Sequence, residues 1–180
     1  MTGFRRALLA FGLTVAMGAT VGEVAAAEPF GPASVRSEAE QDYLDGLRLF
    51  SAADYAGAIS LWSRLGESAD PRSGAGLAFL YTLGAGTPVD EPKAYYWARL
   101  AAERGQPEAQ GILGRFYLEG RVVEKDLIQA FAWCETAQMG GGGNGCRGAA
   151  LRELPDSMLS TAFRASNELQ ERLRRELWGR

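Results

Sequence analysis

One stretch of apolar, small and polar positions occurs twice in this chain, 36 residues apart. Leucine, tyrosine and glycine stand at positions 77, 81 and 84, and again at 113, 117 and 120. Aspartate, alanine, tryptophan, alanine and glycine then follow at the same offsets, so that one copy ends at Gly105 and the other at Gly141. Three- and four-residue spacing of apolar positions is typical of helices. A repeat of this period predicts helix–turn–helix units stacked in an array.

The pattern divides the chain into three helical units. A divergent first unit covers 38–71, where Gly46, Ala58 and Trp62 have tetratricopeptide-like spacing. The second unit, 72–106, has predicted helices at 72–83 and 91–104. The third, 107–143, has predicted helices at 107–119 and from residue 126 to 139. Asp90 and Asp126 are the expected N-caps of the second helices. Val122 stands where the second unit has Gly86, so we expect the two turns to differ.

Residues 144–180 have a different pattern. A short helix is expected at about 146–154, and Pro155 ends it. A last helix over about 158–178, capped by Asp156 or Ser157, carries one apolar stripe that we expect to cover the end of the array. The members of the stripe are Leu159, Ala162, Phe163, Leu169, Leu173 and Leu177. The predicted fold class is therefore all-α: a helix–turn–helix repeat solenoid of about three units with a C-terminal capping helix.

The two copies, Leu77 to Gly105 and Leu113 to Gly141, resemble the Sel1-like repeat family, a relative of the tetratricopeptide repeats. The C-terminal stretch from Ala149 to Leu177 also resembles the ending of many exported bacterial members. The resemblance implies an adaptor that binds other proteins in signalling, envelope assembly or secretion.

The first 27 residues have the features of a secretory signal peptide. Arg5 and Arg6 precede an apolar run over 7–21, and small residues at Ala25 and Ala27 predict cleavage after Ala27. An uncleaved N-terminal membrane anchor is the alternative. We expect a periplasmic or secreted protein that begins with a flexible lead-in over 28–37 and has no stable membrane span after cleavage.

Composition argues against several functions. The chain has 19 basic and 22 acidic residues without a basic stripe, which disfavours a nucleic-acid partner. It has no histidine, and its two cysteines cannot alone form a tetrahedral zinc site. We therefore expect no enzymatic activity, no cofactor and no metal.

The three equivalent tryptophans could form a ladder for stacking ligands, but we interpret Trp62, Trp97 and Trp133 as packing between units, because the position recurs with the repeat. The predicted binding surface is instead the concave wall formed by the first helix of each unit. Aromatic residues near arginines are typical of a peptide-binding surface. The alternatives are that these residues pack sideways or contact the N-terminal arm. The candidates are Tyr43, Leu47, Phe50, Arg72, Phe79, Thr82, Leu83, Glu108, Arg115, Leu118 and Glu119.

The predicted partner is a protein or peptide in the bacterial cell envelope. The alternative ligand is a cell-wall glycan or muropeptide, whose carboxylates and sugar faces would meet Arg72, Arg115 and the aromatic residues.

Cys134 and Cys146 are a possible disulfide. Export into an oxidising compartment and an even cysteine count favour a bridge. The resemblance argues against it, because cysteine-rich Sel1-like proteins have seven residues between the bridged cysteines and eleven stand between these two. The pairing stays open on the sequence alone.

Overall fold

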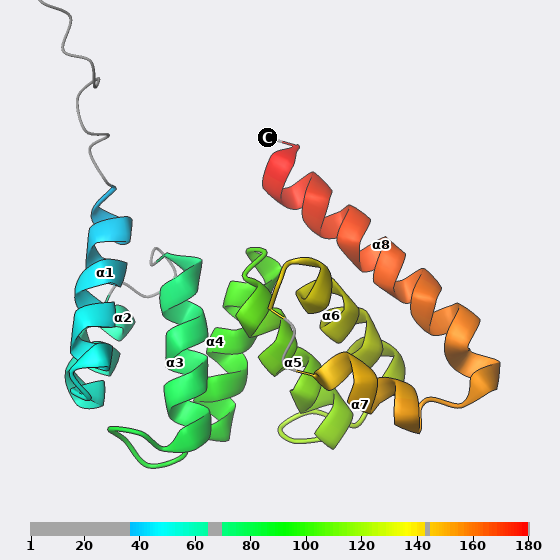
Figure 1. The fold of residues 1–180 in the computed structure, drawn as a ribbon, viewed down its shortest axis with the longest axis horizontal. Coiled ribbons are helices and arrows are strands. Elements are labelled where there is room, and N and C mark those ends of the chain that lie inside the picture. Colours follow the sequence, from blue (N-terminus) through cyan, green and yellow to red (C-terminus); the bar gives the residue numbers. More distant parts are fainter. Residues whose placement is uncertain (1–36, 65–69, 143–144, 180) are drawn as a thin grey trace, which may run out of the picture. The chain divides into compact units, whose positions relative to one another are not determined.

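The computed structural model describes residues 37–64, 70–142 and 145–179, and these residues form helices and connecting turns. The predicted signal peptide, and the lead-in as far as residue 36, lie outside the described residues. Figure 1 shows the helices in chain order. They are α1 (Glu38–Ser51), α2 (Tyr55–Arg64), α3 (Pro71–Leu83), α4 (Glu91–Glu103), α5 (Pro107–Glu119), α6 (Leu127–Met139), α7 (Cys146–Glu153) and α8 (Leu159–Trp178). The all-α repeat fold is confirmed.

The second helix of each matching unit, α4 or α6, begins directly after a capping aspartate. The Asp90 carboxylate accepts a hydrogen bond from the backbone N–H of Lys93 at 3.0 Å. Asp126 accepts from the N–H groups of Ile128 and Gln129 at 2.9 and 3.0 Å. Both predicted N-caps are confirmed, and each satisfies donors that a helix start otherwise leaves unpaired.

The turns between the paired helices are alike, contrary to the expectation from Val122. Gly86 has a φ of +74° and Val122 has a φ of +65°, so both occupy the left-handed region. A Cβ at Gly86 would lie 2.6 Å from the backbone nitrogen of Ala56, whereas the side chain of Val122 is 48% exposed. The third unit therefore keeps the turn and tolerates a β-branched residue there at a cost in backbone strain.

Small and aromatic residues form the core between the helices. The side chains of Trp62, Trp97 and Trp133 are only 2%, 8% and 4% exposed, which confirms their predicted packing role. Alanines beside them, such as Ala98 and Ala137, are fully buried. Small residues let the helix axes approach closely, and each indole then fills the space between units.

The C-terminal helices cover the last unit. α8 packs against α6 (Figure 1). Its residues Ala162, Leu169 and Leu173 are buried. A short 3₁₀ turn, Asp156–Met158, leads into α8, and Met158 at the N-cap makes no side-chain capping bond. The expected cap from Asp156 or Ser157 is therefore wrong, because the 3₁₀ turn supplies the start of the helix.

A disulfide joins α6 to the start of α7. The Cα atoms of Cys134 and Cys146 are 5.6 Å apart, within the usual range for a bridge. Gly114 on α5 faces it, since a Cβ there would lie 2.5 Å from the Cys134 sulfur. The structure thus contains the pairing that the sequence left open.

Candidate binding groove

A cavity of about 350 Å³ opens between the first helices of the three units. Its side walls come from α1, α3 and α5, and Trp62 of α2 lies at its floor. We call it the aromatic groove. It contains six of the predicted binding residues, namely Tyr43, Leu47, Phe50, Arg72, Phe79 and Glu108. Ala75, Gly76, Gln106 and Ile112 complete the lining.

Two glycines clamp the floor of the groove. A Cβ at Gly46 on α1 would lie 2.0 Å from Nε1 of Trp62, and one at Gly76 on α3 would lie 2.5 Å from the far edge of the same ring. The indole therefore fits between α1 and α3 only because neither position carries a side chain. The Trp62 N–H points toward the carbonyl oxygen of Tyr43, 3.4 Å away.

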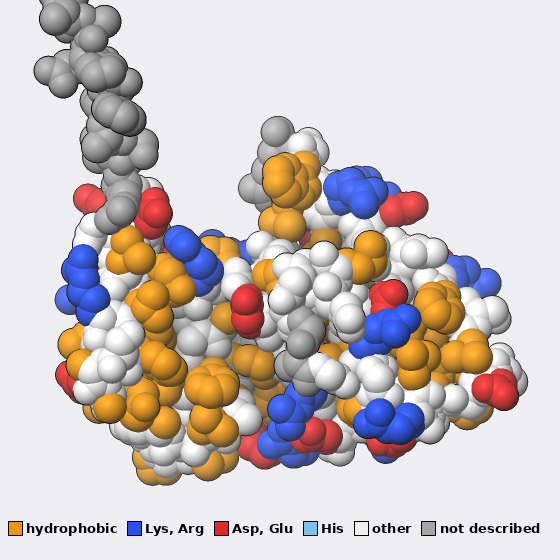
Figure 2. Space-filling model, in the orientation of Figure 1, with side chains coloured by type: hydrophobic (Ala, Val, Ile, Leu, Met, Phe, Trp, Pro, Cys, Tyr) orange, Lys and Arg blue, Asp and Glu red, His pale blue; other side chains and the backbone are white. Residues whose placement is uncertain are grey.

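Aromatic rings stack outward from this floor. The Phe50 ring lies 6.4 Å from the rings of both Trp62 and Phe79, and Tyr43 stacks on Trp62 at 6.3 Å. Phe79 remains 44% exposed and Leu47 38%. Hydrophobic side chains gather over α1 and α3 on the face shown in Figure 2. A contiguous exposed apolar surface of this kind is typical of an interaction site.

Arg72 lies at one end of the groove, where it forms an ion pair with Asp70. Its Nε and Nη2 donate to the two carboxylate oxygens of Asp70, each at 2.9 Å, and its guanidinium lies 4.2 Å from the centre of the Tyr43 ring. Burial by itself raises the pKa of Asp70, but the hydrogen bonds and charge of Arg72 outweigh it, so the pKa is lowered. The hydrogen bonds that Arg72 donates to Asp70 in turn raise the pKa of Arg72.

The groove continues into a second cavity of about 70 Å³ at the other end of α3. Phe79 and Ile112 line both cavities, so the two are neighbours. Thr82, Leu83 and Arg115, three more of the predicted residues, line the smaller one together with Arg121.

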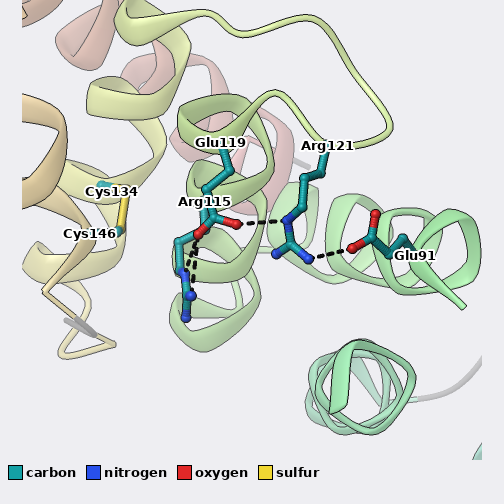
Figure 3. Close-up of polar contacts among 6 residues, drawn as sticks. All are labelled: Glu91, Arg115, Glu119, Arg121, Cys134 and Cys146. Carbon is teal, nitrogen blue, oxygen red and sulfur yellow. Dashed lines mark hydrogen bonds and ion pairs between the residues drawn. A yellow bond between two sulfur atoms is a disulfide. The ribbon is translucent and has the colours of Figure 1, made fainter. Parts of the chain in front are cut away.

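Beside the second cavity, four charged side chains form a chain of ion pairs. Glu119 lies between Arg115 at 3.3 Å and Arg121 at 2.7 Å, and Arg121 reaches Glu91 of the preceding unit at 2.5 Å (Figure 3). The predicted residue Glu119 therefore pairs with arginines and lines neither cavity. Two positive and two negative charges balance at this end.

Leu118 is the predicted binding residue that the structure contradicts. Its side chain is only 6% exposed and belongs to a core with Phe131, Ala150 and Leu154. The equivalent residue of the second unit, Thr82, lines the second cavity. α7 covers this position in the last unit, and nothing in the repeat pattern indicates that.

Sequence reasoning also missed residues that shape the groove. Ile112 occupies the repeat position of Gly76 and lies one helical turn after Glu108, so helical spacing could have found it. Trp62 was expected only as core, yet its ring edge reaches the cavity. Arg121 follows the helix end, where a helical-face argument does not apply.

The described part of the chain gives no sign of a metal or membrane site. Within residues 37–64, 70–142 and 145–179, no three histidine, cysteine or acidic side chains cluster so that they could bind a metal ion. No helix in the same ranges combines the length and apolarity that a membrane span requires.

A family model described as Sel1 repeat matches residues 75–106 and 107–141. The chain is a Sel1-repeat protein. Sel1-repeat proteins generally act as adaptors in protein–protein interactions, and the fold is typically a non-catalytic scaffold.

Solved structures share this fold. The Sel1-repeat chain is similar to c5321, a protective antigen present in uropathogenic Escherichia coli strains, with a TM-score of 0.70 and 28% identity. That match covers 79% of this chain and 32% of the antigen. It is also similar to a Sel1 repeat protein from Oxalobacter formigenes, with a TM-score of 0.54 and 30% identity over 65% of this chain and 90% of that one.

A curated relative matches a shorter stretch. The chitin synthase regulator SKT5 of Saccharomyces cerevisiae is 41% identical over 64 residues, which cover 34% of this chain and 9% of the yeast protein. The Sel1-repeat chain thus spans under a tenth of that protein and about a third of the E. coli antigen.

Proposed function

We propose that this chain is a non-enzymatic adaptor, exported to the bacterial cell envelope, that binds a peptide segment of a partner protein in the aromatic groove. The observation that carries the proposal is the groove itself, where exposed Leu47 and Phe79 flank a cavity with an indole floor. Anchors of this kind provide most of the binding energy in protein interfaces. The yeast relative is named a regulator, which fits a binding role.

Export is part of the proposal and rests on the N-terminal pattern. A disulfide between Cys134 and Cys146 supports it, because such bridges persist in oxidising compartments. Mass spectrometry of the protein from the envelope fraction should find Glu28 as the first residue. An intact N-terminus in washed membranes would contradict cleavage.

The alternative ligand, a cell-wall glycan or muropeptide, is less well matched. Its carboxylates would require an arginine, and the charge of Arg72 is already balanced by the hydrogen bonds that its Nε and Nη2 donate to Asp70.

Peptide display on the purified protein tests the proposal. Selected peptides should bind wild type, and Phe79→Ala should weaken their binding about tenfold or more. An aromatic side chain that becomes buried in the complex contributes more than about 1.4 kcal/mol. Phe163→Ala is the matched control, since Phe163 on α8 is 43% exposed and lies outside the groove lining. Purified muropeptides that bind while no displayed peptide does, or equal effects of the two variants, would contradict the proposal.

A further inference from the structure

We infer that the partner segment places a lysine or arginine beside its apolar anchor and that Glu108 binds this residue. The inference rests on the proposed function, because it specifies the chemistry of the peptide that occupies the aromatic groove. It starts from the charged side chains that line the cavity, which are Arg72 and Glu108.

The charge of Arg72 is already compensated. Two hydrogen bonds of 2.9 Å connect it to Asp70, and its flat face lies over Tyr43. A bidentate pair of this geometry is among the stronger ion pairs in proteins. Because Asp70 already balances its charge, Arg72 attracts a further carboxylate less strongly than an arginine without an ion pair would.

The charge of Glu108 is not compensated in this way. Its carboxylate accepts a hydrogen bond from the neutral side-chain amide of Gln106. Among the residues that the structure describes, no lysine or arginine forms an ion pair with Glu108. The carboxylate is exposed at the first turn of α5, next to an apolar cavity, where an arriving cation could reach it without displacing another.

The surrounding charges also favour a cation. Besides the hydrogen bond that Arg72 donates to Asp70, the charge of Glu40 contributes to the raised pKa of Arg72, so Glu40 is close to this end. Arg104 is close enough to Asp70 to help lower its pKa. Within the described ranges, three carboxylates, Glu40, Asp70 and Glu108, therefore accompany Arg72 and Arg104 here.

The opposite end of the groove has no such imbalance. Arg115 and Arg121 are matched there by Glu119 and Glu91. A basic residue thus gains an ion pair only at the Glu108 end, while the apolar anchor occupies the cavity above Trp62. The asymmetry gives the bound segment a fixed direction, because charge complementarity sets the register of an interface.

The test is a peptide-display selection on three purified proteins: wild type, Glu108→Lys and Glu168→Lys. Glu168 is exposed on α8 and controls for the change in net charge. We expect peptides from wild type and Glu168→Lys to carry lysine or arginine within three positions of an aromatic or aliphatic anchor. Peptides from Glu108→Lys should carry aspartate or glutamate there instead.

Calorimetry on a selected peptide and its Lys→Glu version then measures how much the charge changes the binding affinity. The lysine should tighten binding to wild type about fivefold, the size expected for an exposed ion pair, and the preference should reverse on Glu108→Lys. Peptides without a charge preference that still lose affinity on Phe79→Ala would overturn this inference and leave the proposed function standing. If no peptide binds in the groove, both are overturned.

Discussion

Gly46→Ala should destabilise the protein, although alanine is the better helix former. Gly46 lies within α1, and a Cβ there would be 2.0, 2.4 and 2.7 Å from three atoms of the Trp62 ring. Ordinary contact is about 3.5 Å, so the ring would have to move by more than an ångström. Gly76 blocks that movement on the other side, because the ring already fills the space that a Cβ would need there.

The expected cost follows from two opposing effects. Overpacking a core costs about 1–3 kcal/mol, and a clamped indole belongs at the upper end of this range. Replacing glycine by alanine within a helix stabilises the folded state by about 1 kcal/mol. The net loss should be about 1–2 kcal/mol, which lowers the Tm of a domain of this size by about 2–8 °C.

Urea unfolding followed by circular dichroism measures the change, and Gly148→Ala is the matched control. A Cβ at Gly148 on α7 would meet only the end of the Arg152 side chain, at 3.7 Å, so this variant should gain stability. Replacing Trp62 by leucine should remove most of the penalty at Gly46. If Gly46→Ala is as stable as Gly148→Ala, the Trp62 ring is not held tightly between Gly46 and Gly76.

Four further outcomes are expected. Val122→Gly should raise stability by up to about 1 kcal/mol, because it relieves a left-handed β-branched residue, and a lower melting temperature would refute this. Trp97→Ala should cost about 3–5 kcal/mol in urea unfolding, and a loss below 1 kcal/mol would contradict its core role. Reduction of the Cys134–Cys146 bridge should cost about 2–3 kcal/mol, and alkylation of the denatured, unreduced protein should label no thiol; two labelled thiols per monomer would rule the bridge out. Asp70 is the N-cap of α3, accepting from the backbone N–H of Arg72 at 2.9 Å, and also forms the ion pair with the Arg72 side chain. Asp70→Asn should lower stability at pH 7, where the carboxylate with its lowered pKa is ionised, and the difference from wild type should shrink as the pH falls below about 4; a difference independent of pH would show that the ion pair contributes nothing.

The sequence predicted the helices of the matching units closely, because the repeat determines both ends of each. The helix expected at 107–119 is Pro107–Glu119, and the one expected at 91–104 is Glu91–Glu103. Glycine after the first helix and aspartate before the second are strong local signals. These capping signals depend only on residues near in sequence, so the helix ends could be predicted without the tertiary structure.

What the sequence could not predict depends on contacts between units. Leu118 and Thr82 occupy the same repeat position, yet α7 covers only the first of them. The shape of the turn at Val122 follows the fold and overrides the preference of the residue. The groove was predicted as a surface, but its floor required knowing that Trp62 passes between Gly46 and Gly76.

Because Trp62 lies between α1 and α3, binding in the groove is also coupled to local opening of the first helical unit. In a linear array each unit is held mainly by its neighbour, so the end formed by α1 and α2 opens most easily. A segment that contacts α1, α3 and α5 at once can bind only while the Trp62 ring lies between Gly46 and Gly76. Ligand at a hundred times its Kd would then slow amide exchange over residues 38–64 by about a hundredfold, while exchange in α6 would stay nearly unchanged. Slower amide exchange in the terminal unit would thus show that the partner is bound.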